Sequence, residues 1–543
     1  MPRITTLLTS ILLLSCTGVA AQTSTGSERG DRQAAASSDE AQVFQSAFRM
    51  LADLHMDALS DSALWESALA GMVEGLNDPY ASVFTPVEAD AWDEETTGNY
   101  SGIGVQITML NDEITVTAVF RSTPAEGVGM QVGDVIVGVD DNDATSWDTA
   151  IASDSIRGPV GTVVQVRVKR AGFEQPIAYD IRRNQVHVPA VLYGMMDNGI
   201  AYVIMDRVAR NAAREMDEAL RTMHGAKGMI IDLRRNPGGF LDESLMLADL
   251  FLEPGSTLAS TSQRVRGGSA AQVTSESYED RWPIRVPELP IIVLVDGYTA
   301  SGAEILAGAL QDYDRAIVLG ERSFGKGLVQ TVAPLPAGRK LRFTTGSWHT
   351  PLGRSLHRAR DKEGRPLPEA LDSLPRVRTA GGRDLIAAGG IFPDLAIVDD
   401  TLRLAERELL RMANEARFPL VLRLAEFSFG EAGRLREADP VVVDVSRADF
   451  EEWVGQMVAE GLPADAVADP VARDYLFWRA RLGVAQRLDV VGTEAAIRME
   501  RDPVITRAVG LLAAANSQAD LFSAVRKEQP ARTAGTPSHG QAR

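Results

Sequence analysis

Hydrophobic residues in the middle of the chain form short unbroken runs that are followed by stretches of helical spacing. The clearest runs lie at 228–233, 290–295 and 315–320. A short apolar run bounded by turn residues indicates a buried strand. The stretches 241–252 and 303–313 carry apolar residues at helical spacing and predict helices directly after two of these strands. This part of the chain is therefore expected to have an α/β fold.

A different pattern precedes it, over residues 100–183. Apolar and polar residues alternate in Ser101–Ile107, and Asn111-Asp112 predicts a turn that pairs this strand with the next one. Further strands are expected at 133–139 and 163–168, with a short helix at 146–156 between them. The residues alone predict a small β-rich module, without indicating its purpose.

Helical spacing dominates both flanks. Residues 41–76 predict two helices within an N-terminal arm at 41–99, and such an arm can be a dimerisation element or a lid on the core. Residues 400–525 are charged and helical in pattern, and their role cannot be read from the sequence. The candidate helices there are 402–417, 450–460, 471–486 and 503–516. The tail at 526–543 is expected to be disordered.

The first 21 residues are typical of a secretory signal peptide. A positive start precedes an apolar stretch, and Val19-Ala20-Ala21 fits a small-residue cleavage site. Leu13-Leu14-Ser15-Cys16 also resembles a bacterial lipobox, so lipidation at Cys16 is an open alternative to removal of that residue. Residues 22–40, rich in Ser, Gly, Thr and Ala, predict a disordered linker. We therefore expect a periplasmic or other extracytoplasmic location, with or without a lipid anchor in the membrane.

Composition narrows the function classes. The net charge of −19 argues against nucleic acid as a partner. Cys16 is the only cysteine, which excludes an internal disulfide, a cysteine nucleophile and a thiolate metal site. The chain has no phosphate-binding loop and no cluster of metal ligands, so we predict neither a cofactor nor a metal. A length of 543 residues allows two or three cores.

Ser301 is the candidate nucleophile. It lies between the carboxyl end of the strand at 290–295 and the amino end of the helix at 303–313. Backbone N–H groups are unpaired at a helix start, and the helix dipole favours negative charge there. An attacking alkoxide, or the oxyanion it creates, is best stabilised at such a place. Serine before a helix is also a common N-cap, so its position alone does not define a role.

Lys326 and Gln330 supply a candidate base and a polar group to hold it. They are an even number of residues apart in a predicted strand, which puts both side chains on one face. A free lysine has a pKa of about 10.4, and lowering it to about 7–8 costs roughly 3–4 kcal/mol, which burial can supply. A carboxylate nearby opposes this, so we expect Glu304 and Glu321 to point elsewhere or to pair with Arg322 or Arg315.

Histidine is the competing base. The six histidines are His55, His187, His224, His349, His357 and His539, and none lies within the segment around Ser301. His349 precedes Thr350-Pro351, and it is the histidine to examine if the lysine is not the base.

Five segments, taken in order, carry a family resemblance. They are GAKGMIIDLRRNPGG at 225–239, DGYTASGAEI at 296–305, GERSFGKGLVQ at 320–330, WHTPLGRS at 348–355 and GGIFPD at 389–394. Together they resemble the carboxyl-terminal processing peptidases, also called tail-specific proteases. This is a family of serine peptidases with a Ser-Lys dyad and a PDZ domain. The resemblance implies an α/β peptidase core of the crotonase/ClpP-like type at 184–398, an inserted PDZ-like β domain at 100–183, and helical N- and C-terminal regions.

The resemblance also assigns roles to residues of the core. It implies that Ser301 is the nucleophile, that Lys326 is the general base and that Gln330 orients the lysine. The amide of Gly302, together with that of Gly238 or Gly239, would form the oxyanion hole. The chain departs from the family at Asp296, where Asn is frequent, at Gly302, where Ala is usual, and at Leu352, where a small polar residue is usual.

The PDZ-like module is expected to bind the substrate's carboxyl end. Gly102, Ile103, Gly104 and Val105 would hold the terminal carboxylate on backbone amides and receive an apolar last side chain. In this family the N-terminal arm often dimerises, so a homodimer is one expectation. The implied function is a serine endopeptidase of the cell envelope that cleaves proteins near their C-termini. The alternative is an inactive peptide-binding adaptor that keeps the same fold.

Overall fold

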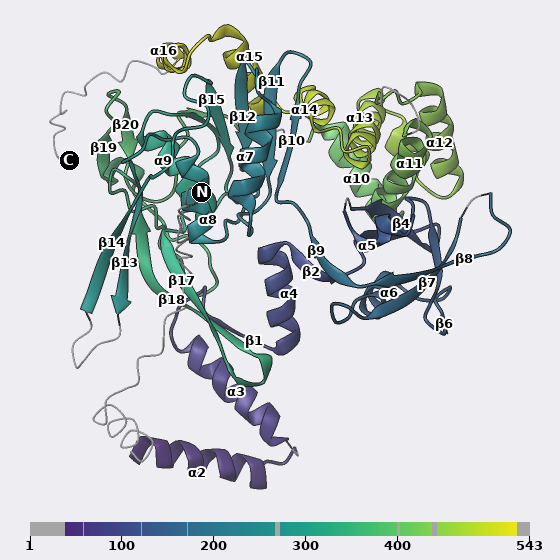
Figure 1. Ribbon diagram of the computed structural model, residues 1–543, viewed down its shortest axis with the longest axis horizontal. Helices are drawn as coiled ribbons and strands as arrows, with labels where there is room; N and C mark the ends of the chain where they lie inside the picture. The colour runs from purple at the N-terminus through teal and green to yellow at the C-terminus, as the bar shows by residue number, and fades with distance from the viewer. Residues whose placement is uncertain are drawn as a thin grey trace, which may run out of the picture. The chain divides into compact units, whose positions relative to one another are not determined.

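The computed structural model describes residues 39–528 apart from 58, 121, 171, 266–271, 399–401 and 437–441 (Figure 1). The predicted signal peptide, Cys16, nearly all of the predicted linker and most of the predicted tail lie outside these residues. The chain divides into a unit at Met1–Asn77 and a unit at Asp78–Arg543.

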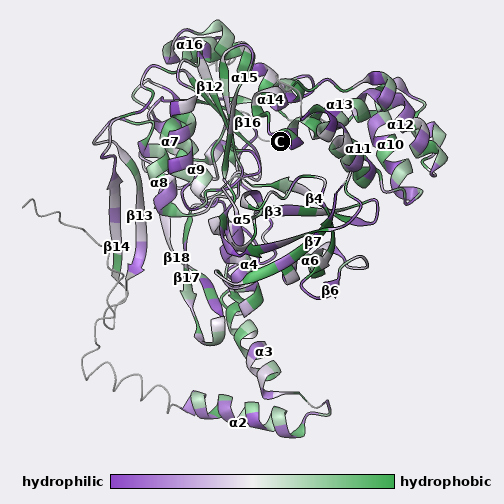
Figure 2. Cartoon of the chain, turned by 45° about the vertical axis from the view of Figure 1, so that its right-hand side comes forward, coloured by the Kyte–Doolittle hydropathy of each residue, from purple (hydrophilic) through white to green (hydrophobic). Residues whose placement is uncertain are grey.

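The first unit consists of two described helices, α2 (Asp39–Leu54) and α3 (Asp61–Glu74). The Phe48 and Trp65 rings stack with their centroids 4.2 Å apart and join the two helices. None of the residues of α2 is buried, and Met50 and Leu54 are 62% and 74% exposed. Green and purple residues alternate along α2 in Figure 2, as expected for an amphipathic helix.

A six-stranded sheet forms the centre of the second unit. Its strand order is β10-β11-β12-β15-β16-β21, and every neighbouring pair except β10–β11 is parallel. The strands are β10 (Val191–Met195), β11 (Ile200–Met205), β12 (Gly228–Asp232), β15 (Ile291–Val295), β16 (Ile317–Gly320) and β21 (Leu395–Ala396). Parallel strands of this kind place their carboxyl ends at one edge of the sheet, where loops carry functional residues.

Helices cover both faces of this sheet. Alternate residues of β15 point to opposite sides, so that Val293 packs against one helical layer and Leu294 against the other. The first layer is α7 (Ala212–Thr222), α8 (Leu241–Asp249) and α9 (Gly302–Asp312), and the second is α14 (Val491–Met499), α15 (Pro503–Ala514) and α16 (Gln518–Glu528). Burial on both faces explains why these strands are continuous apolar runs in the sequence.

A second sheet, of five strands, carries the segment around Gln330. Its order is β1-β18-β13-β14, and β17 also pairs with β18. The strands are β1 (Ser82–Phe84), β13 (Thr257–Val265), β14 (Gln272–Glu279), β17 (Leu328–Pro334) and β18 (Lys340–His349). Strand β1 brings the start of the second unit against β18, with Ser82 opposite Arg342.

The PDZ-like module is a third sheet with two helices, α5 (Pro124–Gly127) and α6 (Thr149–Ile156). Its strand order is β3-β4-β5-β7-β8, with the short β6 paired to β5. The strands are β3 (Val105–Leu110), β4 (Glu113–Val119), β5 (Val135–Val139), β6 (Asn142–Asp143), β7 (Val163–Lys169) and β8 (Ile177–Arg182). Strands β2 (Asn99–Gly102) and β9 (Asn184–His187) pair where the chain enters and leaves the module. Helix α4 (Pro86–Thr97) precedes β2, and the small pair β19 (Arg376–Arg378) and β20 (Asp384–Ile386) lies between β18 and β21 in the chain.

The helical C-terminal region divides into two groups. Helices α10 (Leu404–Glu415), α11 (Leu420–Leu435), α12 (Arg447–Ala459) and α13 (Pro470–Arg487) pack around a core of their own. Helices α14 to α16 instead complete the peptidase sheet, and α16 continues past the predicted end of this region at 525. The pattern did not indicate α11, α14 or α16. In the part of the chain that the structure describes, no helix is both long enough and apolar enough to span a membrane.

Candidate active site

Ser301 lies in a strained turn between β15 and α9. Its φ of 52° and ψ of −118° fall outside the regions that a serine normally occupies. The amide N–H of Ser301 donates to Glu304 Oε2 at 2.8 Å, one turn into the helix. Strained backbone at a strand–helix junction is frequent at the nucleophile of hydrolases, because it presents the side chain at the sheet edge.

The turn that carries Ser301 is fastened to the neighbouring turn after β12. The amide N–H of Ala300 donates to the carbonyl of Asn236 at 2.9 Å. Asp296 Oδ1 accepts the amide N–H of Arg235 at 3.0 Å, and Thr299 Oγ1 donates to the carbonyl of Leu233 at 2.8 Å. These bonds hold the two turns in one arrangement. Asp296 stands where the family frequently has Asn, and its side chain still provides an oxygen that accepts the N–H of Arg235.

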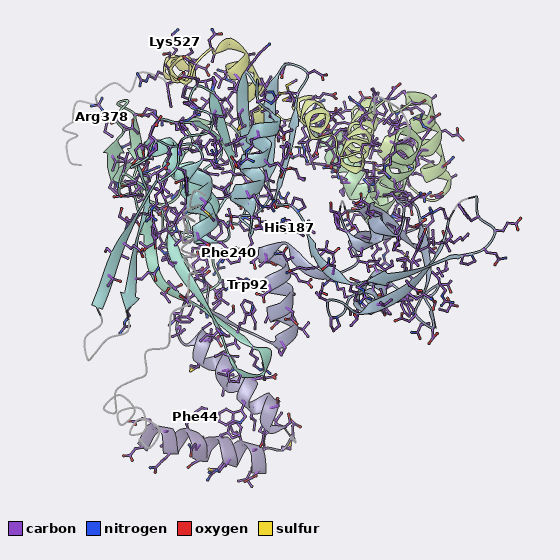
Figure 3. The ribbon with its side chains drawn as sticks, in the orientation of Figure 1. Phe44, Trp92, His187, Phe240, Arg378 and Lys527 are labelled. Carbon is purple, nitrogen blue, oxygen red and sulfur yellow. The ribbon has the colours of Figure 1, made fainter. Side chains whose placement is uncertain are left out.

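The turn after β12 contains two glycines, and only one has a free donor. The N–H of Gly238 donates to Asn236 Oδ1 at 2.8 Å. Among the described residues, the N–H groups of Gly239 and Gly302 have no recorded hydrogen bond, and a Cβ on Gly302 would lie 3.2 Å from Gly239 N. Gly239 and Gly302 are therefore the pair that can bind an oxyanion together. Phe240, labelled in Figure 3, ends this turn.

Gly302 has a local reason to differ from the family's alanine. A Cβ at this position would lie 2.4 Å from Ser244 Oγ on α8, well inside contact distance. Ser244 Oγ is held there because it donates to the carbonyl of Phe240 at 2.8 Å. The small residue after Ser301 thus matches the hydroxyl packed against it.

A buried charge network supports the same turn from the other side. Arg234 Nη2 lies 2.7 Å from Asp232 Oδ2, and Arg234 Nη1 lies 2.8 Å from Asp502 Oδ2. The Tyr202 hydroxyl also donates to Asp232 Oδ2, at 2.6 Å. Burial acts to raise the pKa of Asp232, but Arg234 outweighs it, so the net effect is a lowered pKa. Since Asp502 caps α15, the C-terminal helices are tied directly to the glycine turn.

Lys326 meets the main chemical demand on a base. Burial, assisted by the charge of Arg342, lowers the pKa of Lys326 to about 8. Its Nζ donates to Gln330 Oε1 at 2.7 Å and lies 4.9 Å from the centroid of the Tyr80 ring. The backbone around it is also held, because Trp348 Nε1 donates to the carbonyl of Lys326 at 3.0 Å. A neutral amine is therefore accessible near neutral pH.

The expectation for Glu304 was wrong. It neither points away nor pairs with an arginine, but lies fully buried beneath both candidate catalytic segments. Its carboxylate accepts hydrogen bonds from Ser301 N, Ser323 Oγ, Gly325 N and Lys326 N. Burial raises the pKa of Glu304, while these donors oppose the rise. The need to satisfy unpaired amides at the start of α9 decides its orientation, and Glu304 thereby joins the serine turn to the lysine loop.

No histidine among the described residues lines the cavity around Ser301. His349 lies on β18 and is not among the residues that line the cavity around Ser301. His357 lies beside the lysine loop, since a Cβ on Gly327 would lie 2.6 Å from His357 N. Burial and the charge of Arg360 lower the pKa of His357, but this side chain does not line the cavity either.

One open cavity of about 1520 Å³ brings the predicted site residues together. Its lining includes every predicted residue: Ser301, Lys326, Gln330, Gly238, Gly239, Gly302, Gly102, Ile103, Gly104 and Val105. Other lining residues come from α4, including Trp92, which is labelled in Figure 3. The cavity therefore runs from the PDZ-like module to the candidate dyad.

The peptide-binding residues lie at the free edge of the module's sheet. Strand β3 pairs only with β4, and the N–H groups of Ile103 and Gly104 have no recorded partner among the described residues. The side chain of Ile103 is only 1% exposed and packs in the module's own core, so it forms a floor and not an open wall. Gly104 has a φ of 91°, and a Cβ there would meet Thr123, so a glycine is needed.

Comparison with known proteins decides the family. Residues 199–361 match the model of peptidase family S41, and residues 101–180 match a PDZ domain model. A carboxy-terminal-processing protease of Bartonella bacilliformis is 34% identical over 302 residues, covering 54% of this chain and 68% of that protein. The chain belongs to peptidase family S41.

This S41 peptidase is also similar to a second processing protease and to a solved structure. The carboxy-terminal processing protease CtpA of Bacillus subtilis is 29% identical over 357 residues, covering 65% of this chain and 73% of that protein. Among solved structures, a photosystem II D1 C-terminal processing protease is 23% identical, with a TM-score of 0.33, covering 66% of this chain and 94% of that chain. The predicted fold class is confirmed, and the S41 peptidase is a serine hydrolase.

The sequence did not reveal three groups at the base end of the S41 site. Tyr80 accepts a hydrogen bond from Gln330 through its backbone carbonyl, so its side-chain identity carries no signal. Arg342 comes from β18, the strand that pairs with β17, and Asp78 comes from the start of the second unit. The residues Asp78-Pro79-Tyr80 are a local turn signal that could have drawn attention to this segment.

Proposed function

We propose that this S41 peptidase is an endopeptidase that cleaves proteins near their carboxyl ends through a dyad of Ser301 and Lys326. The observation that carries the proposal is the buried Lys326 amine, with a pKa of about 8, held by Gln330 in the cavity that Ser301 also lines. An adaptor without catalysis has no need for such a lysine, because a buried amine destabilises the fold. The names of the related processing proteases support cleavage near the carboxyl end.

The chemistry follows from the charges at the site. Neutral Lys326 takes the proton of Ser301 Oγ as this oxygen attacks the substrate carbonyl. The N–H groups of Gly239 and Gly302 stabilise the oxyanion, and each such donor is worth about 2.7–4 kcal/mol of barrier. Protonated Lys326 then gives its proton to the leaving amine. A water molecule, deprotonated by the same lysine, attacks the acyl-enzyme, and Lys326 returns that proton to Ser301 Oγ as the ester bond breaks and the second product leaves.

The PDZ domain supplies the choice of substrate in this proposal. An extended peptide would add to the free edge of β3, with its terminal carboxylate on the N–H groups of Ile103 and Gly104. Val105 and Ile156, which line the cavity here, would receive an apolar last side chain. The PDZ domain and the candidate dyad share one cavity, so a bound chain would continue towards Ser301.

Location and assembly are parts of the same proposal. The pattern of residues 1–21 supports export across the inner membrane, with Cys16 as an alternative lipid anchor. The exposed apolar residues of α2 support a homodimer formed through the N-terminal arm. Fractionation of cells expressing the full chain tests the first point, with a Cys16→Ser variant to separate anchoring from release. Light scattering on wild type and a Phe44→Ser, Leu54→Ser variant tests the second.

The direct test of function uses a protein or peptide with an apolar carboxyl end. Wild type should cleave it, and Ser301→Ala should bind without cleavage. The matched substrate control is a peptide of the same composition whose apolar segment is internal and whose carboxyl end is blocked. Binding by wild type without cleavage under all conditions would support the adaptor instead.

A further inference from the structure

We propose that Arg342 is a positioning residue that, with the backbone carbonyl of Tyr80, fixes the amide of Gln330 and offsets the carboxylates around Lys326. The inference rests on the proposed dyad and adds groups that position Gln330, which in turn positions Lys326. We call the segment Asp78–Phe84, which includes β1, the strap. The strap belongs to the second unit and reaches the site from a part of the chain far from both the serine and the lysine.

The hydrogen bonds define the orientation of the Gln330 amide. Gln330 Nε2 donates to the carbonyl of Tyr80 at 3.0 Å, and Gln330 Oε1 accepts from Lys326 Nζ at 2.7 Å. A flipped amide would place an oxygen against the carbonyl and an NH₂ group against the amine. The carbonyl of Tyr80 therefore decides that an acceptor faces Lys326.

Arg342 holds that carbonyl from the other side. Its Nε donates to the carbonyl of Tyr80 at 3.0 Å, so Gln330 and Arg342 share one acceptor. The guanidinium is itself placed by the strap, because its Cζ lies 5.2 Å from the centroid of the Phe84 ring. Phe84 in turn stacks on Trp92 of α4, with 6.0 Å between ring centroids. Figure 3 labels Trp92 on α4.

The strap is anchored to β18 by backbone bonds as well. Asp78 Oδ1 accepts the N–H of Tyr80 at 3.0 Å, and Asp78 Oδ2 accepts the N–H of Thr344 at 3.1 Å. Strand β1 pairs with β18 over three residues, including Ser82 opposite Arg342. These bonds keep the Tyr80 carbonyl within reach of both side chains.

The charges around Lys326 oppose one another. Arg342 on β18 lowers the pKa of the lysine, whereas Asp78 on the strap and Glu304 on α9 raise it. Arg360, whose charge acts on the Tyr80 hydroxyl, is the next cation of this region. Removal of Arg342 would leave two carboxylates to stabilise the protonated amine. Removal of the Asp78 charge would have the opposite effect, so the two substitutions predict shifts of opposite sign.

The experiment measures the rate of labelling by a small fluorophosphonate as a function of pH, on the full chain. A small probe reports on the dyad and does not require the PDZ domain. The variants are Arg342→Met, Arg342→Lys and Asp78→Asn. The matched control is Arg378→Met on β19, where the same substitution removes an arginine whose side chain is 73% exposed. Figure 3 labels this residue.

Arg342→Met should move the midpoint of the pH profile up by about half a unit to one unit, and so slow labelling at pH 7 by about threefold to tenfold. Asp78→Asn should move the midpoint down by a smaller amount. Arg342→Lys keeps the charge and should keep the midpoint near that of wild type. Arg378→Met should change neither the midpoint nor the rate.

Two results would overturn the inference. One is an unchanged midpoint in Arg342→Met with a rate reduced equally at every pH, which a purely structural role would produce. The other is a shift of the same sign in Asp78→Asn and Arg342→Met. Thermal unfolding of each variant shows whether the fold is retained, and Arg342→Lys keeps the inference testable if Arg342→Met does not fold. Failure of the dyad itself is distinguishable, because Lys326→Ala would then label as wild type does.

Discussion

The two halves of the candidate active site are built in different ways. The nucleophile half, with Ser301 and Gly239, consists of turns at the ends of fully buried parallel strands, and backbone hydrogen bonds join one turn to the other. The base half, with Lys326 and Gln330, lies at the edge strand β17 and depends on side chains and on a carbonyl from the strap. The fold therefore fixes the geometry of the first half, whereas single charges can tune the second half.

The largest expected effects come from removing the reacting groups themselves. Ser301→Ala and Lys326→Ala should each reduce peptide cleavage by about a thousandfold or more, because the two groups act as one unit. Their double variant should be no worse than either single variant. Cleavage rates and thermal unfolding on the three proteins check this. Nearly full activity in Lys326→Ala would remove the distinction between the halves, and His357 would be the next base to examine.

The nucleophile half can be broken by a single methyl group. Gly302→Ala places a Cβ 2.4 Å from Ser244 Oγ, so it should lower the free energy of unfolding by about 1–3 kcal/mol and slow cleavage. Ser244→Ala removes the clashing oxygen, so the double variant should recover most of both losses. Denaturant unfolding and kcat on the four proteins of this cycle give the coupling. If the effects of Gly302→Ala and Ser244→Ala simply add, the contact between these two positions is not what destabilises the turn.

Substitution of the orienting residue in the base half should reduce cleavage only in part. Gln330→Ala leaves the lysine in place without its acceptor, so kcat should fall by about tenfold to a hundredfold and remain measurable. The pH profile should also change its midpoint, because Lys326 loses a partner. Complete loss of cleavage in a folded Gln330→Ala protein would give Gln330 a role beyond orientation.

The lowered pKa of Lys326 also predicts an effect on stability. Below pH 8 the lysine is charged in both states, and burial of that charge destabilises the native state, whose pKa is about 8 against 10.5 unfolded. Lys326→Met should therefore raise the free energy of unfolding at pH 7 by about 1–3 kcal/mol, after the loss of the bond to Gln330 is subtracted. The gain should shrink as pH rises from about 8 to 10.5, where wild type binds fewer protons in the native state than in the unfolded state. A constant gain across this range would show that the lysine is not buried as a charge.

The smallest expected effect lies away from both halves, at the PDZ domain. Amidation of the substrate's carboxyl end, or Asp in place of its apolar last residue, should raise KM by about tenfold, equivalent to roughly 1.4 kcal/mol, with little change in kcat. Unchanged KM for both modified substrates would show that the β3 edge does not select substrates in this way.

The sequence could predict those features whose causes are local. The apolar runs at 228–233 and 290–295 were sufficient to place buried strands. The ordered motifs singled out Ser301, Lys326 and Gln330, and the structure shows that these residues line one cavity. Tyr80 and Arg342 were not predictable, since a backbone carbonyl and a lone arginine on the neighbouring strand β18 leave no spacing pattern. Glu304 was misjudged because its charge was weighed against the lysine and not against the unpaired amides at the start of α9. Helices α14 and α16 were not predicted, and the shared role of α14 to α16 could not be read, because the sheet face that they cover is far away in sequence.

The most direct test of the dyad is the pH dependence of fluorophosphonate labelling, with the modified residue identified by mass spectrometry. Wild type should be labelled on Ser301 at a rate that rises to a midpoint near pH 8, the pKa of Lys326, and Lys326→Ala should not be labelled. Labelling of another residue would contradict the account. So would a midpoint of about 6.5, the usual pKa of a histidine, that disappears in His357→Ala or His349→Ala.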